Sequence, residues 1–381
     1  MYSINGYGDM ITDTVRMDAY VRALEKAVRP GAVVLDIGTG TGIFALLACR
    51  MGARRVYAIE TSDAIALARE IARDNGCADS IEFIQELSTR VTPRERADVV
   101  VSDLRGALPF YGGHLPTIMD ARQRLMAPRG TLIPSRDTLW VACVDAADLL
   151  DDTTRPWSQD PLGFDMRAAL KLVTNQWRRV SVKREQMLTE AARLGSVDYE
   201  SVGTPDFTAT VSAKAVRDGH GHGMCAWFDA ELAEGIGFSN APGQPELIYG
   251  QAFFPWPEPV ALEAGDEISF TLRADLEGHD YSMSWSTRIE DGARKRRKAQ
   301  FAQSSFFAAP LSPERLRKLA ATHVPELNDD GRIDTLGLEM MGEGRSLDEI
   351  AQRLARQFPE RFQRWEDALT RAGELSARYG L

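Results

Sequence analysis

The sequence of residues 33–60 reads VVLDIGTGTGIFALLACRMGARRVYAIE and predicts a strand, a glycine turn, a helix and a second strand. The first strand is apolar except for Asp36, as in a parallel sheet that is covered on both faces. The second strand ends on Glu60. Glycine has no Cβ, so the backbone can turn sharply and let a ligand lie against it. Three glycines occupy alternate positions of this turn: Gly38, Gly40 and Gly42.

Two cofactors are compatible with this pattern. A dinucleotide such as NAD requires G-x-G-x-x-G, but here the third glycine, Gly42, comes one residue early. Asp36 would also lie badly beside a pyrophosphate, whereas it would suit the amino group of S-adenosylmethionine (SAM). Glu60 can accept the ribose hydroxyls of either cofactor. We therefore favour SAM over NAD, and a turn that binds nothing is the remaining alternative.

Composition restricts the class of protein. The chain has 381 residues, 44% hydrophobic and 26% charged, as in globular proteins. Its net charge of −10 argues against nucleic-acid binding, and we read the basic run 294–298 as a solvated loop between two strands. No apolar run approaches the roughly 20 residues that span a membrane, and no secretory signal opens the chain. The four cysteines form no C-x-x-C pair, so we expect reduced thiols, a cytoplasmic location and no metal site.

The order of predicted elements divides the chain into three domains. Strands alternate with helices over residues 1–136, which predicts an α/β, doubly wound, Rossmann-like domain. Asp103 ends its fourth strand, at the sheet edge where such folds bind ligands. Residues 137–309 predict an all-β, barrel-like domain, and residues 310–381 a small helical domain. The strands expected in the β domain are Leu139–Val144, Val182–Leu188, Phe207–Ala213, His222–Leu232, Leu247–Phe254, Glu267–Ala274 and Tyr281–Ile289.

Residues 5–290 together resemble the protein arginine methyltransferases. The likeness begins in YGDMITD (7–13), covers the glycine motif at 34–44, and reaches SDLRGALPFY (102–111), which is similar to the family's substrate hairpin. The resemblance implies SAM as cofactor, with Met10 packed on it and Arg16 paired with its carboxylate. It also implies a homodimer formed through an arm near residues 145–175. The expected cofactor-binding residues are Met10, Arg16, Asp36, Gly38, Gly40, Gly42, Glu60, Thr61, Ser88 and Thr89.

The acceptor half departs from the family pattern. The family grips a guanidinium with two glutamates, but this chain has Asp103 and Gly112 at those positions. Leu247–Tyr249 replaces a Thr-His-Trp loop, with Ile248 in place of the histidine, and Ser88 or Thr89 puts a hydroxyl where the family has an adenine-binding acid. We take Asp103, Tyr111 and Tyr249 as catalytic candidates.

These residues predict a SAM-dependent methyltransferase that modifies a nitrogen or oxygen nucleophile of a peptide or protein. Whether that nucleophile is still a guanidinium stays open. A methyltransferase of a small-molecule natural product and a catalytically inactive binding or scaffold protein are the alternatives.

The C-terminal segment carries a second resemblance. LNDDGRI (327–333) and GRSLDEIA (344–351) look like the PqqD-like winged-helix modules that bind leader peptides. That likeness implies a ribosomally made peptide as substrate, with its leader bound by residues 310–381.

Overall fold

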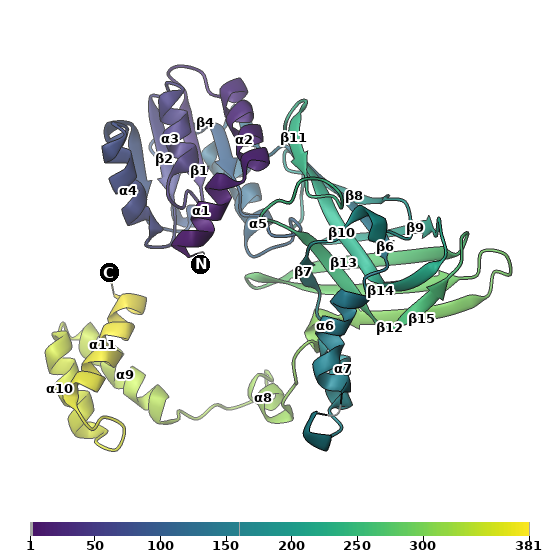
Figure 1. Cartoon of the computed structure of the whole chain (residues 1–381). Coiled ribbons are helices and arrows are strands. Elements are labelled where there is room, and N and C mark those ends of the chain that lie inside the picture. Colours follow the sequence, from purple (N-terminus) through teal and green to yellow (C-terminus); the bar gives the residue numbers. More distant parts are fainter. Residues whose placement is uncertain (1–2, 160, 381) are drawn as a thin grey trace. The chain divides into compact units, whose positions relative to one another are not determined.

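The structure, a computed structural model, describes residues 3–159 and 161–380 (Figure 1). Residues 1, 2, 160 and 381 fall within the ranges predicted for the first domain, the arm and the C-terminal domain, and lie outside the described residues. The described chain divides into two compact units, one up to residue 310 and one from residue 311. The first unit contains a parallel sheet and an antiparallel β domain, and the second is helical. The predicted fold class is confirmed.

A five-stranded parallel sheet forms the first part of the first unit, in the order β3-β2-β1-β4-β5. The order reverses between β1 and β4, and open α/β sheets bind ligands outside the carboxyl ends of strands at such a switch point. Gly38, Glu60 and Asp103 follow β1, β2 and β4 directly, so they meet at this edge. The strands are β1 (Val33–Ile37), β2 (Arg55–Ile59), β3 (Ile81–Ile84), β4 (Ala97–Ser102) and β5 (Met126–Ile133).

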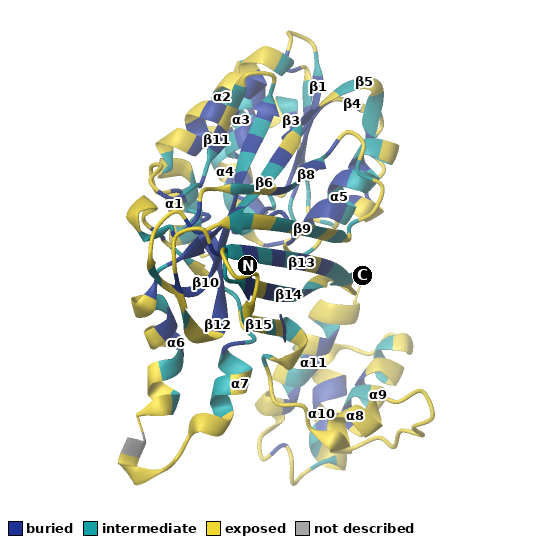
Figure 2. Cartoon of the chain, turned by 90° about the vertical axis from the view of Figure 1, so that its right-hand side faces the viewer, coloured by how far each residue is buried: buried dark blue, intermediate teal, exposed yellow. Residues whose placement is uncertain are grey.

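Helices accompany the sheet, and β1 is buried along its whole length (Figure 2). Burial of every β1 side chain is the result expected of an apolar strand in a parallel sheet. The helix before β5 ends at Asp120, and a π-helical turn follows at Ala121–Leu125. Met126 is already paired with Ala97 in the sheet and cannot continue the helix. The helices that follow the glycine turn are α3 (Ile43–Arg50), α4 (Ala64–Asp74) and α5 (His114–Asp120).

Two helices precede the sheet. They are α1 (Ile4–Thr12) and α2 (Thr14–Ala27), which separate at Asp13. The Asp13 carboxylate accepts a hydrogen bond from the backbone N–H of Arg16 at 3.1 Å and so caps the start of α2. The cap therefore fixes the position in the first turn of α2 from which the Arg16 side chain projects.

Two antiparallel sheets form the β domain. One sheet has the order β7-β12-β10-β6-β8, with β11 paired to β10, and the other has the order β15-β14-β13-β9. The sheets adjoin where β8 lies near β9 and where β12 lies near β15, so the domain is barrel-like. The strands are β6 (Arg136–Val144), β7 (Arg178–Val180), β8 (Ala192–Asp198), β9 (Phe207–Lys214), β10 (Gly219–Ala233), β11 (Ile236–Ser239), β12 (Gln251–Leu262), β13 (Glu267–Glu277), β14 (Asp280–Glu290) and β15 (Arg297–Ser304).

The predicted strand at Val182–Leu188 is wrong. That segment contains a 3-10 turn at Arg184–Gln186, and its Met187 forms only an isolated bridge with Val144. Strand β8 was missed because a register shift opposite Leu139 and Trp140 interrupts its alternation. Strand β15 was missed because the basic run hides its start. The basic run, predicted as a loop, lies in the turn between β14 and β15 only over residues 294–296, and Arg297 and Lys298 begin β15.

Between β6 and β7 the chain forms α6 (Ala147–Ser158) and α7 (Leu170–Val173) within the segment predicted as an arm (Figure 1). Near its tip, Leu162 is 96% exposed and Phe164 is 67% exposed. Exposed apolar side chains of this size in one short segment indicate a surface that meets a partner.

The C-terminal unit contains α8 (Pro313–Lys318), α9 (Asp329–Gly342), α10 (Leu347–Gln357) and α11 (Trp365–Tyr379). The last three pack around a core of their own that includes Ile333, Ile350 and Ala372. A capping box starts α10: the Ser346 hydroxyl accepts from the backbone N–H of Glu349, and the Glu349 carboxylate accepts from the backbone N–H of Ser346. The described residues from 311 to 380 form no strand, so they lack the β-hairpin wing of a winged-helix module. No helix in the described part of the chain is long and apolar enough to cross a membrane.

Candidate active site

The glycine turn after β1 has the backbone that its sequence predicts. Gly38, Gly40 and Gly42 have φ values of 75°, 55° and 89°, in the left-handed region that glycine tolerates best. A Cβ added to Gly40 would lie 2.5 Å from the Tyr7 ring, and one added to Gly38 would lie 2.5 Å from a methyl of Leu104. Tyr7 and Leu104 therefore pack directly against the turn, and neither glycine could carry a side chain without displacing them.

Two overlapping cavities of about 260 Å³ and 330 Å³ lie against this turn. Both are lined by Gly38, Glu60, Thr61, Leu104 and Tyr111, and we call them together the cofactor cleft. The structure thus brings several expected cofactor-binding residues to one place. The other lining residues used below are Tyr7, Met10, Ser88, Asp103 and His114.

Glu60 is placed to bind hydroxyl groups in the cleft. One carboxylate oxygen accepts from the backbone N–H of Gly40 at 3.0 Å, and the other accepts from that of Ser62 at 2.8 Å. These bonds fix the carboxylate across the mouth of the glycine turn. Each oxygen has further lone pairs, so the group can also accept from a diol.

Other expected cofactor-binding residues do not line the cleft. Asp36 is fully buried beneath the turn, where it accepts from the Thr39 hydroxyl at 2.5 Å and from the backbone N–H of Ala45 at 3.0 Å. Burial raises its pKa to about 7. Gly42 caps the start of α3 and faces Ala68. Asp36 and Gly42 shape the turn from behind.

Of the two hydroxyl residues predicted on the adenine side, only one lies in the cleft. Ser88 is buried and lines the cleft, whereas Thr89 is exposed and does not. Both belong to the short 3-10 turn Ser88–Arg90, so only one of the two side chains can face inwards.

A third cavity, of about 430 Å³, adjoins the cleft because Met10 and Tyr111 line both. We call it the acceptor cavity. Asp9 is the acid among its described lining residues. The full lining is Gly6, Asp9, Met10, Arg105, Gly106, Ala107, Tyr111, Trp177, Arg179, Ile248 and Tyr249.

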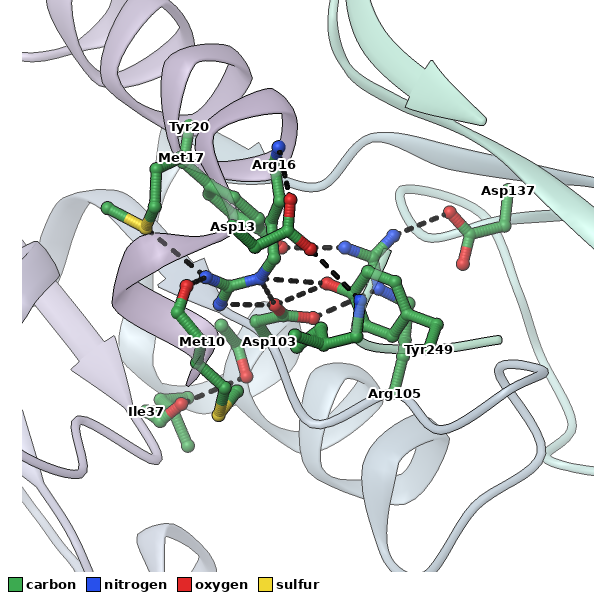
Figure 3. A network of polar contacts seen from close by, with 12 residues as sticks. Met10, Asp13, Arg16, Met17, Tyr20, Ile37, Asp103, Arg105, Asp137 and Tyr249 are labelled. Atoms are coloured by element: carbon green, nitrogen blue, oxygen red, sulfur yellow. Dashed lines mark hydrogen bonds and ion pairs between the residues drawn. The ribbon is translucent and has the colours of Figure 1, made fainter. Parts of the chain in front are cut away.

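Asp103 lies at the junction of the two sites, and its carboxylate is fully engaged (Figure 3). Its Oδ2 accepts from Arg16 Nη2 at 2.6 Å, from Arg16 Nε at 2.7 Å and from the Tyr249 hydroxyl at 2.6 Å. Its Oδ1 accepts from Arg105 Nε at 3.2 Å. Burial alone would raise the pKa of Asp103, but the charges of Arg16 and Arg105 and the bond from Tyr249 outweigh burial and lower the pKa to about 2.

Arg16 does not line the cavities, although it was predicted to bind the cofactor carboxylate. Besides Asp103, its guanidinium contacts the Tyr249 hydroxyl at 3.0 Å and the backbone carbonyl of Met10 at 2.9 Å (Figure 3). It therefore ties α1 and the Tyr249 loop to the substrate hairpin.

Arg105 extends this network into the β domain. Its Nη1 donates to Asp137 at 2.8 Å and its Nη2 to the Tyr20 hydroxyl at 2.7 Å. The guanidinium also lies over the rings of Phe228 and Phe238, 5.2 Å and 5.4 Å from their centroids. The two positive charges in this buried network therefore balance its two negative charges; the four residues are Arg16, Arg105, Asp103 and Asp137.

The network ends at His114. The Tyr199 hydroxyl donates to Asp137 at 2.6 Å, so at 3.0 Å it must accept from His114 Nε2. Burial lowers the pKa of His114 to about 3, which keeps the imidazole neutral. His114 is therefore a buried, neutral hydrogen-bond donor.

Sequence reasoning pointed to Asp103 and Tyr249, which the structure brings into contact, but it missed Asp137, Trp177 and Arg179. The signal that could have revealed Arg105 and Asp137 is a charged residue within or beside an apolar segment. Arg105 lies in LRGAL, and Asp137 opens DTLWVACV. Nothing local marks Trp177 or Arg179, because strand pairing alone brings β7 to this cavity.

Comparisons with known families cover both parts of the first unit. Residues 135–290 match the model of the arginine methyltransferase oligomerization subdomain. Residues 14–134 match that of ribosomal protein L11 methyltransferase (PrmA). The two matched ranges meet at the boundary between β5 and β6.

Curated relatives extend the likeness over most of the first unit. The arginine N(omega)-methyltransferase of Streptomyces achromogenes subsp. streptozoticus is 30% identical over 281 residues, which cover 70% of this chain and 77% of the relative. The probable protein arginine N-methyltransferase 1.2 of Arabidopsis thaliana is 30% identical over 272 residues, covering 69% of this chain and 74% of the relative.

Solved structures show the same fold. The Trypanosoma brucei PRMT1 enzyme-prozyme heterotetrameric complex with AdoHcy matches with a TM-score of 0.72 at 24% identity, over 78% of this chain and 96% of that one. Arabidopsis thaliana protein arginine methyltransferase 10 matches with a TM-score of 0.69 at 21% identity, over 79% of this chain and 97% of that one.

Proposed function

Because the chain belongs to the arginine methyltransferase family, we propose that it transfers the methyl group of SAM to a nitrogen or oxygen nucleophile of a peptide or protein. One observation carries the proposal: the cofactor cleft and the acceptor cavity share Met10 and Tyr111, so a ligand in each would meet there. Holding two reactants in contact is the main requirement of a displacement that needs little acid–base chemistry.

The cleft has the chemistry that SAM requires. The Glu60 carboxylate suits the ribose hydroxyls, Ser88 suits the adenine side, and Gly38 lines the cleft without a side chain of its own. SAM supplies an electrophilic methyl group, which a lone pair of the acceptor displaces with loss of a proton, leaving S-adenosylhomocysteine. The residues of the chain hold the acceptor, orient it and exclude water.

We assign Asp103 and Tyr249 to orienting the site and Tyr111 to the wall that its two halves share. Asp103 accepts from two arginines and a tyrosine, so it fixes the hairpin and the Tyr249 loop at the methyl-transfer point. Its charge is balanced by that network. An arginine acceptor would therefore meet Asp9 as the acid of the acceptor cavity, rather than two hairpin glutamates.

The test combines cofactor binding with methyl transfer. Calorimetry of the purified chain with S-adenosylhomocysteine should show one site per chain, and Gly40→Arg should abolish it because that side chain would enter the space of Tyr7. SAM labelled in its methyl group should then label arginine-containing peptides, and Asp103→Asn should slow labelling. Absence of cofactor binding by the wild-type chain would exclude the proposed function, and full activity of Asp103→Asn would remove Asp103 from the site.

The arm and the C-terminal unit suggest two partners. We propose that the arm tip, with exposed Leu162 and Phe164, pairs two copies of the chain, and the match to an oligomerization subdomain supports this. We propose that the C-terminal unit holds the leader of a ribosomally made peptide. A surface cavity of about 480 Å³ lined by Arg356, Phe362 and Trp365 is where we place it. Trp365→Ala in the full chain should weaken leader binding without changing S-adenosylhomocysteine affinity.

A further inference from the structure

The charged residues of the acceptor cavity differ in how many of their hydrogen-bonding groups are already engaged by the protein. Three charged residues line it: Asp9, Arg105 and Arg179. Arg105 is fully buried and spends its donors on Asp103, Asp137 and Tyr20. Arg179 is exposed, and within the described chain the one hydrogen bond of its side chain runs from Nη1 to the backbone carbonyl of Ile248 at 3.1 Å. Arg179 is therefore the cation with donors to offer.

The Arg179 side chain is held in place although it is exposed. Its stem packs over Gly250, where an added Cβ would lie 3.0 Å from Arg179 Cγ. Its tip is anchored on the Ile248 carbonyl. The guanidinium thus lies where the acceptor cavity meets a neighbouring cavity of about 440 Å³, which it also lines. A fixed planar fork of donors suits a carboxylate, and little entropy is lost when it binds one.

Asp9 gives the cavity a direction. It lies on α1 beside Met10, which borders the cofactor cleft, whereas Arg179 lies on β7. A carboxylate on the acceptor would be repelled from α1 and attracted to β7. The nucleophile would then be left at the Met10 and Tyr111 end, where the two sites meet.

We propose that Arg179 recognises a carboxylate on the methyl acceptor, so that the enzyme selects acceptors with an anionic group close to the nucleophile. The inference rests on the proposed methyl transfer and narrows its substrate class. The carboxylate can be the α-carboxylate of a C-terminal residue, or the side chain of an acidic residue next to the modified one.

Binding of matched probes tests the proposal without requiring turnover. The full-length chain, saturated with S-adenosylhomocysteine, is titrated in a calorimeter with Nα-acetylarginine and with its amide. A second pair is a blocked peptide in which the residue after arginine is aspartate or asparagine. In at least one pair, we expect the acid to bind about tenfold to a hundredfold more tightly than its neutral partner. This difference corresponds to the charge-assisted hydrogen bonds that the neutral probe cannot form. The pair that shows the preference identifies the source of the carboxylate.

The variants decide whether Arg179 causes the preference. Arg179→Met should reduce it to less than about threefold while leaving the affinity of the neutral probe unchanged, and Arg179→Lys should retain part of it. Arg193→Met removes an exposed arginine of β8 that lines no part of the cavity and should behave as wild type. Equal affinities for acid and amide, no binding of any probe, or a preference that survives Arg179→Met would each overturn the proposal. If the acid preference follows Arg179 but SAM yields no methylated product, the proposed function fails and the carboxylate site stands.

Discussion

Replacing Arg105 by methionine should destabilise the first unit strongly, because it removes one member of a buried charge network. The Arg105 side chain has no exposed surface and donates to Asp103, Asp137 and Tyr20. Asp103 keeps Arg16 and Tyr249, but Asp137 keeps only the Tyr199 hydroxyl. Breaking a buried ion pair from one side costs about 3–5 kcal/mol. This is a large share of the roughly 5–15 kcal/mol by which a domain is stable.

The magnitude can be assigned to the pair by a double-mutant cycle. Asp137→Asn removes the charge that Arg105→Met leaves behind, so the double variant should be more stable than the sum of the single changes by at least about 1.5 kcal/mol. Unfolding in guanidinium chloride, followed by tryptophan fluorescence, gives each free energy. Arg193→Met serves as the exposed control and should change stability by less than about 0.5 kcal/mol.

Two outcomes would refute the reasoning. If Arg105→Met costs less than about 1 kcal/mol, the guanidinium is not part of a desolvated network. If the two changes add within about 0.5 kcal/mol, Arg105 and Asp137 do not act as a pair, whatever the cost of each.

Three further predictions concern the cleft, the pH response and assembly. Glu60→Gln should weaken S-adenosylhomocysteine binding about tenfold to a hundredfold, since a charge-assisted hydrogen bond is worth about 1.5–3 kcal/mol, and unchanged calorimetric affinity would separate Glu60 from the ribose. Because the pKa of His114 is about 3 in the folded chain and near 6.5 unfolded, the folded state binds fewer protons, and its stability falls as the pH drops below about 6.5. His114→Gln should therefore lose about 2 kcal/mol less than wild type between pH 7 and pH 5 in urea unfolding, and parallel losses would contradict the neutral, buried state. Phe164→Asp should convert dimers to monomers in analytical ultracentrifugation with cofactor affinity preserved, and an unchanged sedimentation coefficient would rule out the arm tip as the contact.

The parallel sheet could be predicted because its signals are local. Residues 33–60 encode strand, turn and helix in a period and a glycine spacing that few other structures share. The position of Asp103 at the sheet edge followed from the same logic, since it directly follows an apolar strand. A family resemblance added roles for Met10 and Arg16, which no local pattern gives.

The acceptor side could not be predicted in the same way, because pairing between distant strands builds it. Arg179 reaches the cavity through the pairing of β7 with β12, and Asp137 reaches Arg105 through the start of β6. Asp36 shows the opposite error. Its position beside the turn suggested a ligand contact, but in the structure its carboxylate accepts from Thr39 and Ala45 beneath the turn.

Asp13 connects the start of α2 to the loop at Ile248 through two hydrogen bonds. One oxygen of its carboxylate caps α2 at Arg16, and the other accepts from the backbone N–H of Ile248 at 3.0 Å, in the loop that walls the acceptor cavity. The junction of α1 and α2 therefore cannot shift without moving that loop. If a ligand in one site selects one position of this junction, it changes the affinity of the other site. Thermodynamic linkage then requires that a ligand in the second site change the affinity of the first by the same factor. The Asp13 carboxylate is the contact through which such coupling between cofactor and acceptor binding would pass.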